Sequence, residues 1–110
     1  MDSAISNSAL KIHLAWGPER AKPFATRVTA AHPGLSPHDI QALERDFSQI
    51  ESAAWGSVVA AMKAHGMNDA AARTSWKKPL LAKWPWLSEA NLSSLWTQGC
   101  YYAWHDGELT

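Results

Sequence analysis

The chain has 110 residues, of which 46% are hydrophobic, enough for one compact core, and this composition excludes a chain that stays disordered. Ten lysines and arginines balance ten aspartates and glutamates, so no overall charge draws the protein to nucleic acid or to an anionic membrane. The longest stretch without a charged residue, 90–105, is shorter than the roughly 20 apolar residues of a membrane span. We therefore expect a single domain over 1–110, with 1–8 as a disordered tail and without a membrane partner.

Cysteine content and the N-terminal residues indicate the compartment. The one cysteine, Cys100, cannot form an intramolecular disulfide. The first residues lack the basic segment and the long apolar segment of a signal peptide. Both features favour a cytoplasmic protein.

The N-terminal third allows two interpretations. Apolar residues alternate with others over 10–16 (LKIHLAW), which is the periodicity of a strand. The same residues would also suit a short helix capped by Ser8. A helix over about 23–31 should follow, ended by the sequence His-Pro-Gly at 32–34.

The segment 37–65 carries the strongest helix signal. Ser36 is a good N-cap residue, Pro37 suits the first helical position, and Asp39 places a negative charge at the positive end of the helix. Apolar residues then recur every three or four positions, which predicts one long helix. Because Gly56 costs about 1 kcal/mol relative to alanine inside a helix, a break near this glycine is the alternative.

Two more helices are expected in the second half of the chain. Asn68 should cap a helix that Pro79 ends, because proline disfavours helical backbone in the residue before it. Ser88 should cap the last helix, which runs until the Asp-Gly pair at 106–107. The predicted fold class is all-α, with four or five helices and, if 10–16 is extended, one short N-terminal strand.

Aromatic residues concentrate in the segment 84–104, which contains four of the seven tryptophans and both tyrosines. Such a cluster marks the centre of a core or a surface that meets a partner. On the last helix one stripe suits the core: Leu92, Leu95, Trp96, Gly99, Tyr102 and Ala103. Trp86, Tyr101 and Trp104 are left outside this stripe and would form a protein interface. We therefore predict a non-catalytic protein that associates with another protein or with itself as a homodimer, in which Gly99 would let the helices of two copies approach closely.

The segment 73–84 suggests nucleic-acid binding as the alternative function. It combines basic and aromatic residues, namely Arg73, Trp76, Lys77, Lys78, Lys83 and Trp84. The cations would contact phosphates while the rings stack on bases. The competing interpretation is a solvated basic edge whose tryptophans face the core. The last helix contains no lysine or arginine, so it is not a recognition helix for the major groove.

The order of elements near the N-terminus is similar to that of the ribbon-helix-helix repressors. The alternating segment 10–16 precedes a helix, and Gly34-Leu-Ser36 then opens another helix. In that family the paired strands of a dimer enter the major groove, which implies that Lys11, His13 and Ala15 face bases. The similarity covers roughly a third of the chain.

The sequence contains no catalytic motif, phosphate loop or metal-ligand spacing. Its five histidines lie too far apart for a local zinc motif, and one cysteine cannot supply a structural cysteine site. Cys100 and His105 would point about 140° apart on one helix, which argues against a nucleophile and base pair. We therefore expect no catalytic residue, no metal and no cofactor. A small ligand-binding protein or enzyme with a pocket among the tryptophans is a second alternative.

Overall fold

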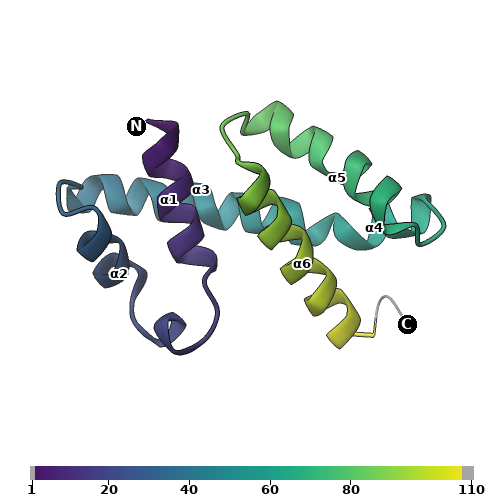
Figure 1. Cartoon of the computed structure of the whole chain (residues 1–110), viewed down its shortest axis with the longest axis horizontal. Coiled ribbons are helices and arrows are strands. Elements are labelled where there is room, and N and C mark those ends of the chain that lie inside the picture. Colours follow the sequence, from purple (N-terminus) through teal and green to yellow (C-terminus); the bar gives the residue numbers. More distant parts are fainter. Residues whose placement is uncertain (1, 108–110) are drawn as a thin grey trace. The chain divides into compact units, whose positions relative to one another are not determined.

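A computed structural model describes residues 2–107, whose regular elements are α-helices and one short 3-10 helix, joined by turns and loops. The all-α prediction is confirmed for this part of the chain, and no strand occurs in it (Figure 1). Within the same range, no helix combines the length and the hydropathy that crossing a membrane requires. In chain order the elements are α1 (Ser3–Leu14), η1 (Pro18–Ala21), α2 (Phe24–Ala31), α3 (Pro37–Gly56), α4 (Val58–Ala64), α5 (Asp69–Lys83) and α6 (Glu89–His105).

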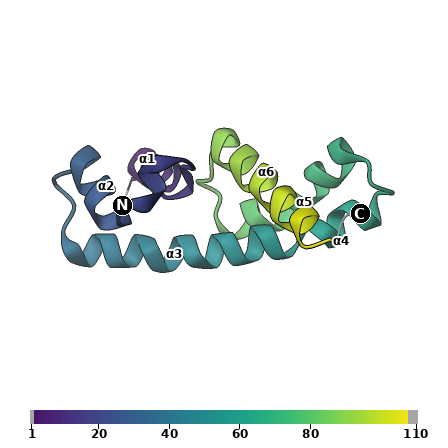
Figure 2. The same ribbon diagram turned by 90° about the horizontal axis from the view of Figure 1, so that it is seen from below.

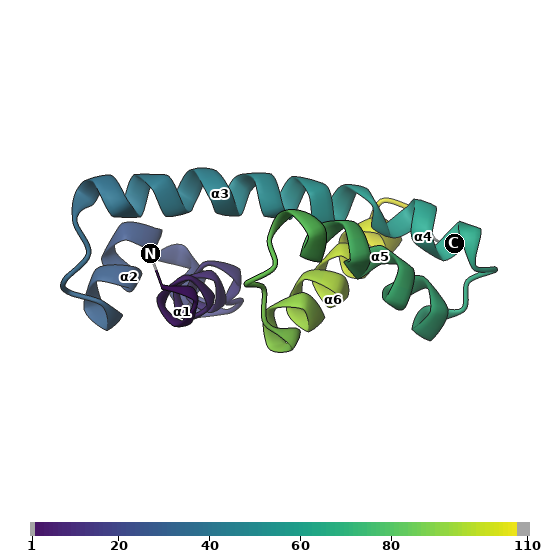
Figure 3. The same ribbon diagram turned by 90° about the horizontal axis from the view of Figure 1, so that it is seen from above.

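The helices group into two compact units, and the single domain over 1–110 stays a prediction. The first unit ends at Gln49 and the second begins at Ile50, so α3 contributes to both. In the first unit α1 and α2 pack together beside the early turns of α3 (Figures 1 and 2). In the second unit α4 packs against both α5 and α6 (Figures 2 and 3).

An aromatic cluster joins the three helices of the first unit. The ring of His13 on α1 lies 5.1 Å from that of Phe24 on α2 and 5.4 Å from that of Phe47 on α3, between ring centroids. The two phenylalanine rings are 5.8 Å apart, and all three pairs meet edge to face. Such pairs add to the stabilisation that burial provides, so this cluster holds the unit together.

The strand interpretation of 10–16 is wrong, because α1 includes these residues up to Leu14. Leu10 and Leu14, four positions apart, are buried on one helical face, whereas Trp16 beyond the helix is exposed. The alternation of apolar residues over 10–16 therefore does not reflect a strand. It arises because the buried face of α1 is followed by an exposed tryptophan. Without a strand there is no ribbon to enter a major groove, so the similarity to the ribbon-helix-helix repressors does not extend to their structure.

The N-cap of α1 is Asp2 and not Ser8. The Asp2 carboxylate accepts hydrogen bonds at 2.7 and 3.1 Å from two backbone N–H groups of the first turn. A capping acid satisfies donors that have no partner within the helix. The helix therefore begins inside the segment 1–8 that we expected to be a disordered tail.

The predicted start of α3 is confirmed by its capping interactions. The backbone N–H of Ser36 donates to the Asp39 carboxylate at 3.1 Å, and the Ser36 hydroxyl accepts from the Asp39 N–H at 3.1 Å. The bond from the Ser36 N–H, followed by the Ser36 side chain, lowers the pKa of Asp39. This reciprocal pair fixes where α3 begins.

The prediction of one long helix over 37–65 is wrong, because the segment forms two helices, α3 and α4. The alternative, a break near Gly56, is confirmed. Side-chain donors occupy carbonyl oxygens at this point. The Ser57 hydroxyl donates to a backbone oxygen one turn back at 2.7 Å, and the indole N–H of Trp76 donates to the Ala54 oxygen at 2.7 Å. In a continuous α-helix the Ala54 oxygen would accept a hydrogen bond from the backbone N–H four residues later. Competition for these oxygens, next to a glycine, explains the break.

The expectation that Pro79 ends a helix is wrong, because α5 continues through it to Lys83. Proline inside a helix costs about 3 kcal/mol, since it lacks an N–H and crowds the preceding turn. Trp76 and Leu80 lie on either side of Pro79 and are both buried. Burying large apolar side chains contributes about 1.5–3 kcal/mol each, which offsets the cost of the proline. Asn68 caps α5 as predicted, accepting from a backbone N–H at 3.0 Å.

Candidate protein interface on the last helix

The start and end of α6 match the prediction. The Ser88 hydroxyl accepts from the backbone N–H of Asn91 at 3.2 Å, and the helix stops before Asp106. Between these two ends α6 is a regular helix, so the position of a residue in the sequence sets the side of the helix on which its side chain lies. This defines which residues pack inside the second unit and which remain on its surface.

One face of α6 packs into the second unit. The ring of Trp96 lies 5.1 Å from that of Trp76, and its indole N–H donates to the Asp69 carboxylate at 3.0 Å. The ring of Tyr102 lies 5.1 Å from that of Trp55. The predicted core stripe is confirmed, with Tyr102 half-buried and the others buried, namely Leu92, Leu95, Trp96, Gly99 and Ala103.

Gly99 lies where α6 contacts the end of α3 and the start of α4. A methyl group added at Gly99 would lie 2.7 Å from Cγ2 of Val58 and 3.2 Å from Cδ1 of Trp55. Real carbon contacts are essentially never as short as the first of these distances. The prediction that Gly99 lets two copies approach is therefore wrong, since the glycine is required inside the second unit.

An uncharged, exposed stripe runs along another face of α6. Its members recur at three and four positions and are all exposed: Ser94, Thr97, Tyr101 and Trp104, which we call the α6 surface. Trp104 is 61% exposed and Tyr101 is 46% exposed, the first being the largest exposure of any large hydrophobic residue in 2–107. The Tyr101 ring is held 5.6 Å from that of Tyr102. Trp86, the third predicted interface residue, is half-buried.

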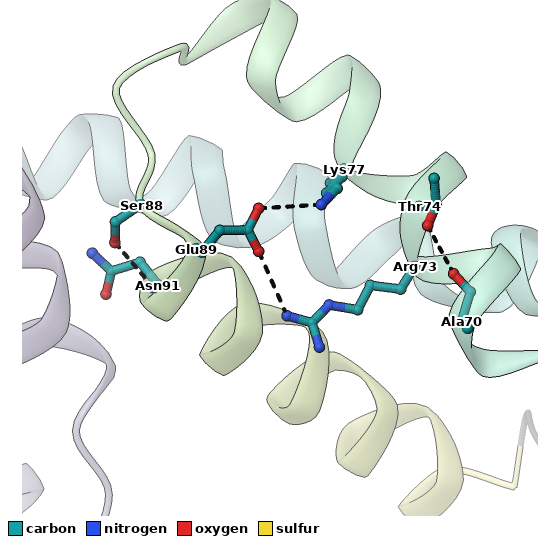
Figure 4. A network of polar contacts seen from close by, with 7 residues as sticks. All are labelled: Ala70, Arg73, Thr74, Lys77, Ser88, Glu89 and Asn91. Carbon is teal, nitrogen blue, oxygen red and sulfur yellow. Dashed lines mark hydrogen bonds and ion pairs between the residues drawn. The ribbon is translucent and has the colours of Figure 1, made fainter.

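Basic residues of α5 pair with an acid at the start of α6 (Figure 4). Lys77 Nζ lies 3.1 Å from a Glu89 carboxylate oxygen, and Arg73 lies 4.0 Å from the other oxygen. Exposed ion pairs of this kind contribute about 0–1 kcal/mol. Their significance is electrostatic, because Glu89 offsets part of the positive charge that nucleic-acid binding would require. Sequence reasoning missed this pairing, since Glu89 follows Lys77 by twelve positions and is brought back by the turn between helices.

The two tryptophans of the basic segment face the core. Trp76 and Trp84 are buried, and the Lys83 ammonium lies 4.8 Å from the centre of the Trp84 ring. A base can stack only on an exposed ring, so neither tryptophan can take the role that nucleic-acid binding assigns to it. The burial of both rings supports the competing interpretation of 73–84, a basic edge with inward tryptophans. Lys78 and Lys83 remain exposed.

Cys100 lies on α6 beside the exposed stripe and is half-buried. Burial raises the pKa of its thiol, and the negative charge of Asp69 raises it further. A thiol that holds its proton is a weak nucleophile, because the thiolate is the reactive form. Within residues 2–107, no group of three or more His, Cys, Asp or Glu side chains could hold a metal ion.

The thiol of Cys100 should react slowly in the folded protein. At neutral pH we expect a thiol reagent to label it at least about tenfold more slowly than in urea, since burial and a raised pKa both reduce attack. Replacing Asp69 by asparagine removes the negative charge, keeps an acceptor for Trp96, and should speed native labelling. Equal rates with and without urea would contradict the packing of α6 described above. The measurement is mass spectrometry of the reagent adduct over time.

Two pockets in the first unit do not contain aromatic residues. One lies on the polar side of α3, among Gln41, Glu44, Arg45, Ser48 and Gln49. The other lies among Ile12, Ala15, Glu19, Arg27, Ala30 and Ala31. Neither corresponds to the tryptophan-lined pocket that the sequence suggested as a second alternative.

No family model, curated protein or solved structure matches this chain. Among the exposed large hydrophobic residues of 2–107, Trp104 on the α6 surface is the most exposed.

Proposed function

We propose that this protein acts by protein–protein association through the α6 surface, and that it forms a homodimer there. The observation that carries the proposal is the exposure of Trp104, with Tyr101 one turn before it on the same helix. Tryptophan and tyrosine are enriched at the centres of protein interfaces, where they bury large areas with few freely rotating bonds. The other face of α6 is occupied by the core of the second unit, so these two rings are available for a partner.

The absence of charge on the α6 surface favours a second copy as the partner. No Asp, Glu, Lys or Arg occurs between Glu89 and Asp106. Two identical copies of a charged surface would repel each other, whereas two copies of this one would not. A twofold axis makes a single patch complementary to itself, which is the commonest arrangement among soluble oligomers. The overall charge of zero removes long-range repulsion between copies as well.

Replacing Trp104 by lysine should weaken the dimer by at least about 30-fold, because an interface anchor contributes about 2 kcal/mol or more. Sedimentation equilibrium over a micromolar concentration series measures the dissociation constant. The matched control is Trp16→Lys, which changes the same residue type at a similarly exposed position, 45%, in the first unit. The control should leave the dimer unchanged.

Two results would contradict the proposed dimer. One is a wild-type protein that sediments as a monomer at high micromolar concentration. The other is an equal loss of dimer in the Trp104→Lys and Trp16→Lys variants, which would place the contact elsewhere. Circular dichroism of both variants shows whether the helices are retained, and since both side chains are exposed we expect them to be.

A further inference from the structure

The first unit contains a pocket that the proposed interface does not use. It has a volume of about 410 Å³ and is formed by α1, α2 and the 3-10 helix between them. Pockets that bind small molecules in proteins span roughly 300–1,000 Å³ and are lined mostly by apolar groups with a few placed polar ones. Here the apolar lining consists of Ile12 and three alanines, and the polar lining of Glu19 and Arg27.

The side chain of Arg27 is held in place at two points. Its Nε–H donates to the backbone oxygen of Lys22 at 3.0 Å, and a terminal N–H donates to the backbone oxygen of Ile12. A guanidinium has five N–H groups, so others remain to donate to a ligand. Throughout 2–107 no carboxylate pairs with Arg27. The pocket therefore presents a fixed cation that lacks an acidic partner beside an apolar surface.

The alanines create the space in this pocket. Ala15 follows α1, and Ala30 and Ala31 end α2, so three of the lining residues have short side chains. Together with Ile12 they contribute side chains that carry no hydrogen-bonding groups. This lining suits a hydrocarbon chain or ring, because such a group gains by leaving water and loses no hydrogen bond on entry.

We propose that this pocket binds a small apolar carboxylic acid. Its carboxylate accepts charge-assisted hydrogen bonds from Arg27, and its hydrocarbon part lies against Ile12 and the alanines. The remaining charge in the lining is Glu19, which pairs with Lys22 at 3.2 Å. Since Lys22 pairs with Glu19, Arg27 is the charged side chain of the lining that no opposite side-chain charge offsets. Its charge favours a monoanion over a neutral or cationic ligand.

Octanoate and 1-octanol test this proposal, because they share a chain length and differ in charge. Titration of the isotope-labelled protein followed by backbone NMR gives both the affinity and the place of binding. We expect octanoate to bind at least about tenfold more tightly than octanol and to shift amide signals within residues 12–31. Equal affinity for the two compounds, no binding of octanoate at millimolar concentration, or shifts confined to other residues would overturn the proposal.

Pocket variants separate this site from non-specific binding. Ala31→Leu fills the space with a residue that also favours helices, and it should lower octanoate affinity by about tenfold or more. The control Ala25→Leu makes the same change at an exposed position of α2 outside the lining, and it should not alter affinity. Equal behaviour of these two variants would overturn the proposal.

Charge variants supply an independent check. Glu19→Gln removes the repulsive carboxylate and frees Lys22, so octanoate should bind more tightly while octanol changes little. Trp104→Lys should not affect octanoate binding, since Trp104 is not in the lining. Weaker octanoate binding in Glu19→Gln, or loss of binding in Trp104→Lys, would contradict the assignment.

Discussion

Replacing Trp96 by alanine should destabilise the protein by about 3–5 kcal/mol, the range for removing a buried tryptophan. The ring is almost completely buried and meets Trp76 edge to face, so its removal leaves a cavity in the second unit. Since small domains are stable by only about 5–15 kcal/mol, this loss is a large fraction of the total. Urea unfolding followed by circular dichroism measures it.

Two further variants separate the causes of this loss. Trp96→Phe keeps an aromatic ring and loses the hydrogen bond to Asp69, and because Asp69 is exposed to water we expect a smaller effect. Trp104→Ala removes the same residue type from the surface of the same helix and should change the stability of the monomer by less than about 0.5 kcal/mol. Similar losses at positions 96 and 104 would show that α6 does not pack as described.

Substitution of two glycines by alanine should have opposite effects. Gly99→Ala should destabilise the protein by about 1–3 kcal/mol, because the new methyl group would lie 2.7 Å from a carbon of the buried Val58. Gly56→Ala should stabilise it by up to about 1 kcal/mol, since Gly56 is helical and a methyl group there meets nothing within 4 Å. Thermal unfolding of the two variants gives the sign of each effect.

A double-mutant cycle tests the cause of the Gly99 effect. In a Val58→Ala background the methyl group added at position 99 has space, so the cost of Gly99→Ala should fall. If the cost is the same in both backgrounds, the contact with Val58 does not cause it. A neutral Gly99→Ala variant would mean that α6 and the start of α4 are further apart than the structure places them.

Local sequence signals determined where α3, α5 and α6 begin. Ser36, Asn68 and Ser88 were each predicted as caps, and each accepts a hydrogen bond from a backbone N–H three positions later. These interactions depend only on neighbouring residues, so the sequence is sufficient to predict them. The spacing of apolar residues on α6 likewise predicted which residues are buried and that Tyr101 and Trp104 are exposed.

The tertiary structure alone decided the features that depend on contacts distant in sequence. Burial of Trp76 and Leu80 carries α5 through Pro79, and the indole of Trp76 takes a carbonyl oxygen at the break between α3 and α4. The site of Arg27 exists because a loop brings α2 back to the end of α1. The helix propensity of a glycine or proline at a single position changes the stability of a helix by about 1–3 kcal/mol. Packing against residues distant in sequence contributes free energies of the same size or larger, so these contacts decide where a helix continues or breaks.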